Sequence, residues 1–224
     1  MTAPDPTAHA WWLASRASGI TAFLLVSCSV LLGLAMATKI LRGRVRPPVL
    51  VKLHEHLALA GLVAIAVHAI TLLGDAWLNP GPVGLLVPFT IDHEPLFTGL
   101  GIIAAYLAAL LGLSYYVRRR IGTKRWRSLH RLTLLVYVLG VIHTLGAGTD
   151  ASTAWMRAIL LVTGAPILLL ALLRWLPDLG AAGTARPAGA APGRRPQTDH
   201  PELSTVTAGA ARPAERPRPA GVTT

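Results

Sequence analysis

The sequence predicts an all-α integral membrane protein, a bundle of about five transmembrane helices. Of its 224 residues, 53% are hydrophobic and only 14% are charged, and the mean hydropathy is positive. Because a soluble domain averages about 25% charged residues, this composition suits a lipid environment better than water. Apolar runs of roughly 20 residues, the length that crosses a hydrocarbon core, fill most of the chain up to position 176. The lipid bilayer is therefore the first partner that we expect.

Five apolar runs divide the chain into spans and connections. The predicted spans are 12–37, 51–73, 96–117, 128–145 and 154–176. Together they form a transmembrane domain over residues 11–176, preceded by a short extracytoplasmic segment at 1–10. That segment has an acidic residue and prolines instead of a basic region, so we expect no cleaved signal peptide. Residues 177–224 are mostly Ala, Gly, Pro, Arg and Thr, which predicts a disordered cytoplasmic tail.

The charges of the connections predict the orientation in a cell membrane. Lys and Arg cluster between spans one and two and between spans three and four, whereas connections 74–95 and 146–153 carry only acidic charges. By the positive-inside rule, the N-terminus lies outside and the C-terminus in the cytoplasm. The net charge of +11 is thus a topology signal, and we expect no nucleic-acid partner. Within connection 74–95, the apolar stretch 83–89 is too short to span and forms either an interfacial cap or a plain loop.

Four of the eight histidines stand out by their placement in two of the predicted spans. The four that carry the prediction are His54 and His68 in span two, and His130 and His143 in span four; His56, also in span two, is the fifth histidine within a span. A polar ring within a span is costly and usually has a functional partner, and imidazole is a common axial ligand of haem iron. Fourteen residues place the first two within about 40° of one helix face and about 21 Å apart along it. Both spans start at the cytoplasmic side, so the four histidines predict two b-type haems, between His54 and His130 and between His68 and His143.

Two points of this arrangement remain open: the shape of the helix that carries His130 and His143, and the choice between His54 and His56 as a ligand. Thirteen residues leave His130 and His143 about 140° apart on an ideal helix, which requires a π-bulge or an irregular start near His130. Gly140 either marks the distortion or lets a macrocycle pack closely. His56 competes with His54, but its twelve-residue spacing to the second histidine of that span turns it about 120° off the shared face.

Other polar residues near the span ends are secondary candidates. Arg16 and Arg157 lie near the outer ends of spans one and five, where each either pairs with haem propionates or anchors its helix at the interface. His93 stands between two acidic residues of an outer connection, as a contact for an incoming metal ion or as a solvated loop residue. No catalytic side chain is expected.

Four stretches of the chain resemble a known family. They are 12–20 (WLASRASGI), 53–68 (LHEHLALAGLVAIAVH), 126–130 (WRSLH) and 141–148 (VIHTLGAG). The sequence resembles the ferric reductase-like transmembrane family, which includes the membrane parts of ferric reductases and NADPH oxidases and the haem subunit of the bacterial methionine sulfoxide reductase system. The resemblance covers about residues 11–176 and implies that His54, His68, His130 and His143 are the axial ligands.

The expected function is electron transfer across the bilayer. No glycine-rich nucleotide fingerprint follows the last span, so electrons are expected from a separate cytoplasmic flavoprotein or a quinol, with flavin or quinone supplied by that partner. Ferric iron, oxygen or an extracytoplasmic protein is the expected acceptor. One alternative is a histidine-lined transporter of divalent metals or protons, for which Glu55 is the sole carboxylate within a predicted span. A haem-free membrane anchor subunit is another.

Overall fold

The computed structural model describes residues 9–182, with side chains up to Trp175, and this part of the chain contains helices and connections without a strand. Five helical segments are long and apolar enough to cross a membrane. They confirm the predicted all-α bundle with five spans, and the chain is a multi-pass membrane protein. The spans are α1 (Ala10–Ala37), α2 (Pro47–Leu72), α4 (Pro95–Leu113), α6 (Thr123–His130) continued by α7 (Thr133–Ala147), and α8 (Ala154–Ala182).

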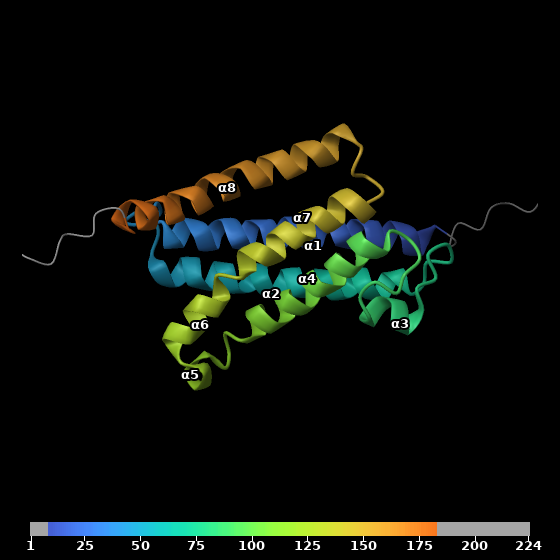
Figure 1. Ribbon diagram of the computed structural model, residues 1–224, viewed down its shortest axis with the longest axis horizontal. Helices are drawn as coiled ribbons and strands as arrows, with labels where there is room; N and C mark the ends of the chain where they lie inside the picture. Colours follow the sequence, from blue (N-terminus) through green and yellow to red (C-terminus); the bar gives the residue numbers. More distant parts are fainter. Residues whose placement is uncertain (1–8, 183–224) are drawn as a thin grey trace, which may run out of the picture. The chain divides into compact units, whose positions relative to one another are not determined.

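Helix α1 packs through small residues, while many large apolar side chains of the bundle face outward. Figure 1 shows α1 between α2 and α8, with α4 running beside α7. On α1 the buried positions are Ser15, Ala22, Ser27 and Ser29. Small residues let helix backbones approach closely, which favours association in lipid, where apolar burial gives no net drive. By contrast, side chains such as Val162 are 74% exposed, as expected for a surface that meets lipid.

The fourth span is broken directly after His130. On both sides of the break, backbone N–H groups donate hydrogen bonds to the carbonyl three residues earlier instead of four. Examples are Leu132 N–H to the Leu129 carbonyl and Leu135 N–H to the Leu132 carbonyl, both at 2.9 Å. Each residue of such a 3₁₀ turn rotates about 120° instead of about 100°, so four of them reduce the mismatch between the two histidines from about 140° to about 60°. This is the irregular start that the spacing required. Gly140 lies inside the continuous α7 and marks no distortion.

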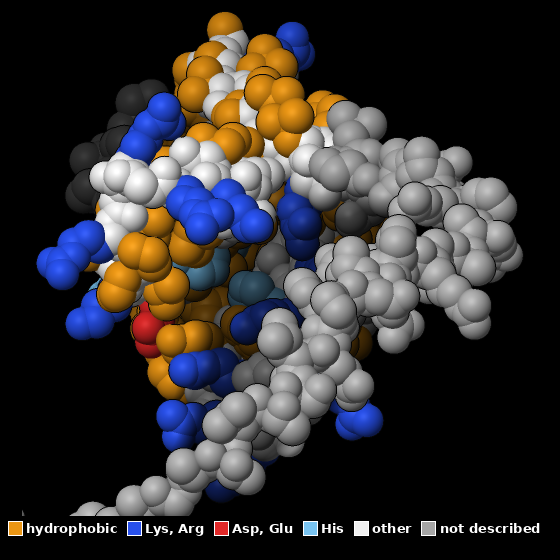
Figure 2. All heavy atoms as spheres, turned by 90° about the vertical axis from the view of Figure 1, so that its left-hand side faces the viewer, with side chains coloured by type: hydrophobic (Ala, Val, Ile, Leu, Met, Phe, Trp, Pro, Cys, Tyr) orange, Lys and Arg blue, Asp and Glu red, His pale blue; other side chains and the backbone are white. Residues whose placement is uncertain are grey.

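The two ends of the bundle carry opposite charges. The α1–α2 connection, α5 (Arg118–Ile121) and α6 lie at one end, named here the basic end, and Figure 2 looks onto it. Lys and Arg side chains surround a recess there in which histidine side chains are visible. The α2–α4 and α7–α8 connections form the acidic end. Which end faces the cytoplasm stays a prediction. The acidic end carries Asp75, Asp92, Glu94 and Asp150.

Two segments differ in detail from the prediction. The connection predicted to hold a cap or a loop contains a short helix, α3 (Gly81–Leu86), to whose last carbonyl the hydroxyl of Tyr106 on α4 donates a hydrogen bond at 2.5 Å. Helix α8 continues to Ala182, so residues 177–182, predicted to be disordered, are helical. This segment contains Pro177 and Gly180, which disfavour a helix, but it continues a helix that is already formed and needs no new nucleus. Residues 1–8 and 183–224 lie outside the described residues, and so does most of the predicted tail.

Candidate functional site

Two pairs of histidines face each other across the bundle. The ring centres of His54 and His130 are 6.0 Å apart with ring planes at 88°, and those of His68 and His143 are 6.4 Å apart at 71°. In each pair one ring comes from α2 and the other from the α6–α7 span. The structure therefore brings together the residues that the spacing predicted to meet. His56 stays exposed, with its Nδ1 2.6 Å from a carbonyl of its own helix turn.

Three of the four rings are anchored through Nδ1 to a backbone carbonyl of a neighbouring helix. A carbonyl oxygen only accepts hydrogen bonds, so Nδ1 carries the proton in each of these rings. The lone pair on Nε2 is then free to bind a metal, and metal-bound histidines usually have such an outer partner. The donor and acceptor residues are His54 and Ser29 at 2.9 Å, His68 and Ser15 at 2.8 Å, and His143 and Phe97 at 3.0 Å.

His130 differs from the other three. Its Nδ1 is buried and has no hydrogen-bond partner. The ring instead stacks on Trp126, one turn earlier on α6, with 4.9 Å between ring centres and 24° between planes. The indole N–H of Trp126 donates to the hydroxyl of Ser114 at 3.1 Å, which ties α6 to the end of α4. His130 is therefore oriented by stacking rather than by a hydrogen bond.

The geometry of both pairs fits the axial ligands of a haem. A metal–imidazole bond is about 2 Å long and the ring nitrogen lies about 1.1 Å from the ring centre, so opposed ligands have ring centres about 6 Å apart. The two observed separations are close to this value. At Gly140, one turn before His143, no atom lies within 4 Å of an added Cβ, which leaves the helix surface open beside the pair.

Clusters of three or more metal-binding side chains do not occur among the residues whose placement the structure describes. A protein site for a bare metal ion usually supplies at least three ligands. A porphyrin brings four nitrogens of its own, and two histidines complete the six ligands of its iron. Two facing imidazoles are thus a donor set that can complete the ligands of a haem iron.

The two arginine candidates have different surroundings. Arg16 forms an ion pair with Asp150 of the α7–α8 connection, donating from two of its nitrogens to the two carboxylate oxygens. Asp150 is buried, whereas Arg16 also lies over the ring of Trp12, 5.0 Å from its centre. Arg157 is exposed. The ion pair joins residues 134 positions apart, and no local pattern of the sequence signalled it. A contact of either arginine with haem propionates stays a prediction.

Glu55 is a carboxylate within α2, and a tyrosine hydroxyl donates a hydrogen bond to it. The hydroxyl of Tyr116, just beyond α4, donates to its Oε1 at 2.9 Å. This hydrogen bond to a carboxylate raises the pKa of Tyr116 above its ordinary value. Glu55 follows His54 in the chain, so the contact links α2 to the α4–α5 connection near the basic-end pair.

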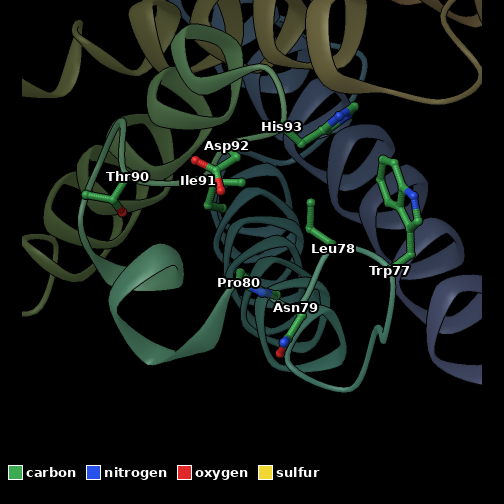
Figure 3. A pocket seen from close by; sticks show the side chains of 8 residues that line it. All are labelled: Trp77, Leu78, Asn79, Pro80, Thr90, Ile91, Asp92 and His93. Atoms are coloured by element: carbon green, nitrogen blue, oxygen red, sulfur yellow. The ribbon is translucent and has the colours of Figure 1, made fainter.

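A separate pocket of about 230 Å³ lies at the acidic end (Figure 3). One side of it comes from the α2–α3 connection and the other from the α3–α4 connection. The ring of His93 lies 5.0 Å from that of Trp77, at 70°. His93 therefore belongs to a loop pocket and does not join the paired histidines.

Sequence reasoning missed the residues that anchor the rings. Ser15 and Ser29 are fourteen residues apart on α1, the same spacing as His54 and His68 on α2. The acceptors are their backbone carbonyls, so the matched spacing could be recognised only once the packing of α1 against α2 was known. The same holds for Phe97, whose acceptor is also a backbone carbonyl, which any residue type has.

Comparison with known proteins places the chain in a family. No solved structure matches it. The family described as ferric reductase like transmembrane component matches residues 18–141, which is more than half of the 224 residues. The matched region contains His54, His68 and His130 and ends two residues before His143. Together with the five apolar helices, this match shows that the chain belongs to the ferric reductase-like transmembrane component family.

Proposed function

We propose that this chain is a di-haem b-type membrane cytochrome that moves electrons across the bilayer. The observation that carries the proposal is the pair of facing imidazoles at each of two depths, with ring centres 6.0 and 6.4 Å apart. Membership of the ferric reductase-like family supports it, because that family indicates a membrane component of electron transfer.

In this proposal, His54 and His130 hold one haem at the basic end, and His68 and His143 hold the other at the acidic end. When bound, haem iron supplies reversible one-electron chemistry at two depths of the membrane. The protein supplies the ligands and their orientation. The Nδ1–H bonds of three rings fix the tautomer that presents Nε2, and they make the imidazole a more basic ligand.

The histidine pairs also restrict the chemistry. A haem held between two imidazoles would have no open coordination site for a substrate, so it would supply outer-sphere electron transfer only. This suits a relay between a donor and an acceptor on opposite sides of the membrane.

We place the donor at the basic end and the acceptor at the acidic end of a protein in the cell membrane. The positive-inside rule assigns the basic connections to the cytoplasm, where a separate flavoprotein meets the protein or a quinol binds from the bilayer. Ferric iron, oxygen or an extracytoplasmic protein accepts the electron at the other side. Anaerobic mixing of the oxidised protein with a reduced flavoprotein or with a quinol distinguishes the two donor classes.

An absorption spectrum tests the proposal. The purified protein in detergent is measured as a reduced-minus-oxidised difference, and its haem is quantified as the pyridine haemochrome. We expect two b haems per chain with low-spin bands, because each iron has two imidazole ligands. Absence of haem in protein produced with ample haem supply would overturn the proposal.

A further inference from the structure

Each of the three anchored histidine rings rests against a glycine of a neighbouring helix. The glycines lie on α1 and α4, the helices that also supply the carbonyl acceptors. An ideal Cβ added at any of them would be within 3.2 Å of a ring atom, which is closer than nearly all real Cβ contacts. The pairs are Gly19 with His68 at 3.0 Å, Gly33 with His54 at 3.2 Å, and Gly101 with His143 at 2.5 Å.

In all three cases the glycine follows the acceptor carbonyl by four residues. In an α-helix, the carbonyl of residue i bonds the N–H of residue i+4 and keeps a second lone pair for another donor. Every Cα–Cβ bond tilts toward the helix N-terminus, so the Cβ of residue i+4 leans over that carbonyl. A glycine there leaves the oxygen open to an approaching ring. The carbonyl and glycine positions are 15 and 19, 29 and 33, and 97 and 101.

We propose that Gly19, Gly33 and Gly101 are positioning residues for the paired histidines. Each opens one helix carbonyl as the acceptor for a ring Nδ1–H and so fixes the tautomer and orientation of one ligand. The consequence for haem binding rests on the proposed function, whereas the tautomer is a property of the protein itself.

His130 provides an internal contrast. It is the one paired histidine without such a carbonyl and glycine, and it is the one whose buried Nδ1 has no partner.

Glycines that serve close helix packing have different neighbours. An added Cβ at Gly61 would meet Val26 at 3.2 Å, and one at Gly112 would meet the end of Leu62 at 3.2 Å. Contact with an imidazole therefore separates the three positioning glycines from these.

Single alanine substitutions test the proposal in the full-length protein. Gly101→Ala has the shortest Cβ contact and is expected to act most strongly, followed by Gly19→Ala and then Gly33→Ala. Loss of an outer partner of a metal ligand typically weakens metal binding about 10- to 100-fold. We expect a weakening of this size for the haem at the altered level, with retention of the other haem showing that the bundle still folds. Unchanged haem binding in all three variants would contradict the predicted role of these glycines in haem binding.

Matched controls separate positioning from general packing. Gly112→Ala changes the same helix as Gly101→Ala, but the added Cβ would contact only the flexible end of Leu62. In Gly164→Ala on α8, the added Cβ would make an ordinary contact of 3.4 Å with the hydroxyl of Tyr137. Both should retain two haems.

A second readout does not require haem. In protein labelled with ¹⁵N-histidine and free of paramagnetic iron, NMR distinguishes rings protonated at Nδ1 from rings protonated at Nε2. We expect the Nδ1–H form for His54, His68 and His143, and a change of one ring in each glycine variant. Tautomers that stay the same in all three variants would overturn the inference. A wild-type protein that shows these tautomers but binds no haem would overturn only the proposed function.

Discussion

The two histidine pairs differ in how firmly the protein holds them. At the acidic end both rings are anchored, His68 to the carbonyl of Ser15 on α1 and His143 to that of Phe97 on α4. At the basic end only His54 is anchored, while the Nδ1 of His130 has no partner. A ligand fixed by a neighbouring helix needs little reorganisation on binding a metal. The acidic-end pair is therefore the better prepared of the two.

The helices that carry the two pairs show the same contrast. His143 lies on the continuous α7, which has Val136 and Tyr137 in its buried face. His130 is the last residue of α6, an eight-residue helix without a buried residue, directly before the break. Segments with few buried contacts open locally at low free energy. At the basic end, His130 thus has a ring nitrogen without a hydrogen-bond partner and lies on a helix with few buried contacts. Its ring should therefore change orientation more easily than those of the acidic-end pair.

Removal of a ligand should have the largest effect. We expect His68→Ala or His143→Ala to remove the acidic-end haem and leave one haem per chain, because a single imidazole does not hold the iron from both faces. The pyridine haemochrome gives the ratio of haem to protein. His56→Ala is the control, since that exposed ring faces away from the pairs and both haems should remain. Two haems in both ligand variants would contradict the assignment.

The order of haem release should show the difference between the pairs directly. When the ferric protein is mixed with an excess of a haem scavenger such as apomyoglobin, we expect the basic-end haem to leave about 10- to 100-fold faster, because His130 lacks the outer partner that the other rings have. The released fraction is identified by comparison with the His143→Ala variant, which retains only the basic-end haem. Equal release rates would remove the contrast between the two pairs.

The Arg16–Asp150 ion pair should contribute to the stability of the acidic end. It joins α1, next to the carbonyl that anchors His68, to the α7–α8 connection. Arg16→Ala leaves a buried carboxylate unpaired, and since a third of the arginine is exposed we expect a loss of about 1–2 kcal/mol in unfolding free energy. Thermal unfolding in detergent measures it. Arg157→Ala, at an exposed arginine, should change stability much less, and an equal loss in both variants would argue against the ion pair.

The smallest effect is expected at the stacked tryptophan. Ser114→Ala removes the acceptor of the Trp126 indole N–H, a neutral hydrogen bond worth about 1 kcal/mol. The stack on His130 remains, so we expect both haems to be retained and the basic-end haem to leave only a few times faster in the scavenger experiment. Trp126→Ala, which also removes the stack, should increase that rate further. An effect confined to the acidic-end haem would not fit this geometry.

Hydropathy and histidine spacing predicted much of this protein. A run of about 20 apolar residues has few alternatives to a transmembrane helix, because every backbone polar group must be satisfied within the segment. The five spans could therefore be predicted one by one. The thirteen-residue spacing of His130 and His143 also predicted an irregular helix, since an ideal one leaves the rings on different faces.

The sequence by itself thus determined the spans, their polar connections and the levels of the four histidines, because these follow from local composition and helix geometry. Only the tertiary structure decided what holds the rings. The acceptors at Ser15, Ser29 and Phe97 are backbone carbonyls, which every residue has, and an oxygen becomes an acceptor only when packing brings a ring to it. Arg16 likewise finds Asp150 across 134 residues through the packing of helices, which no local pattern encodes.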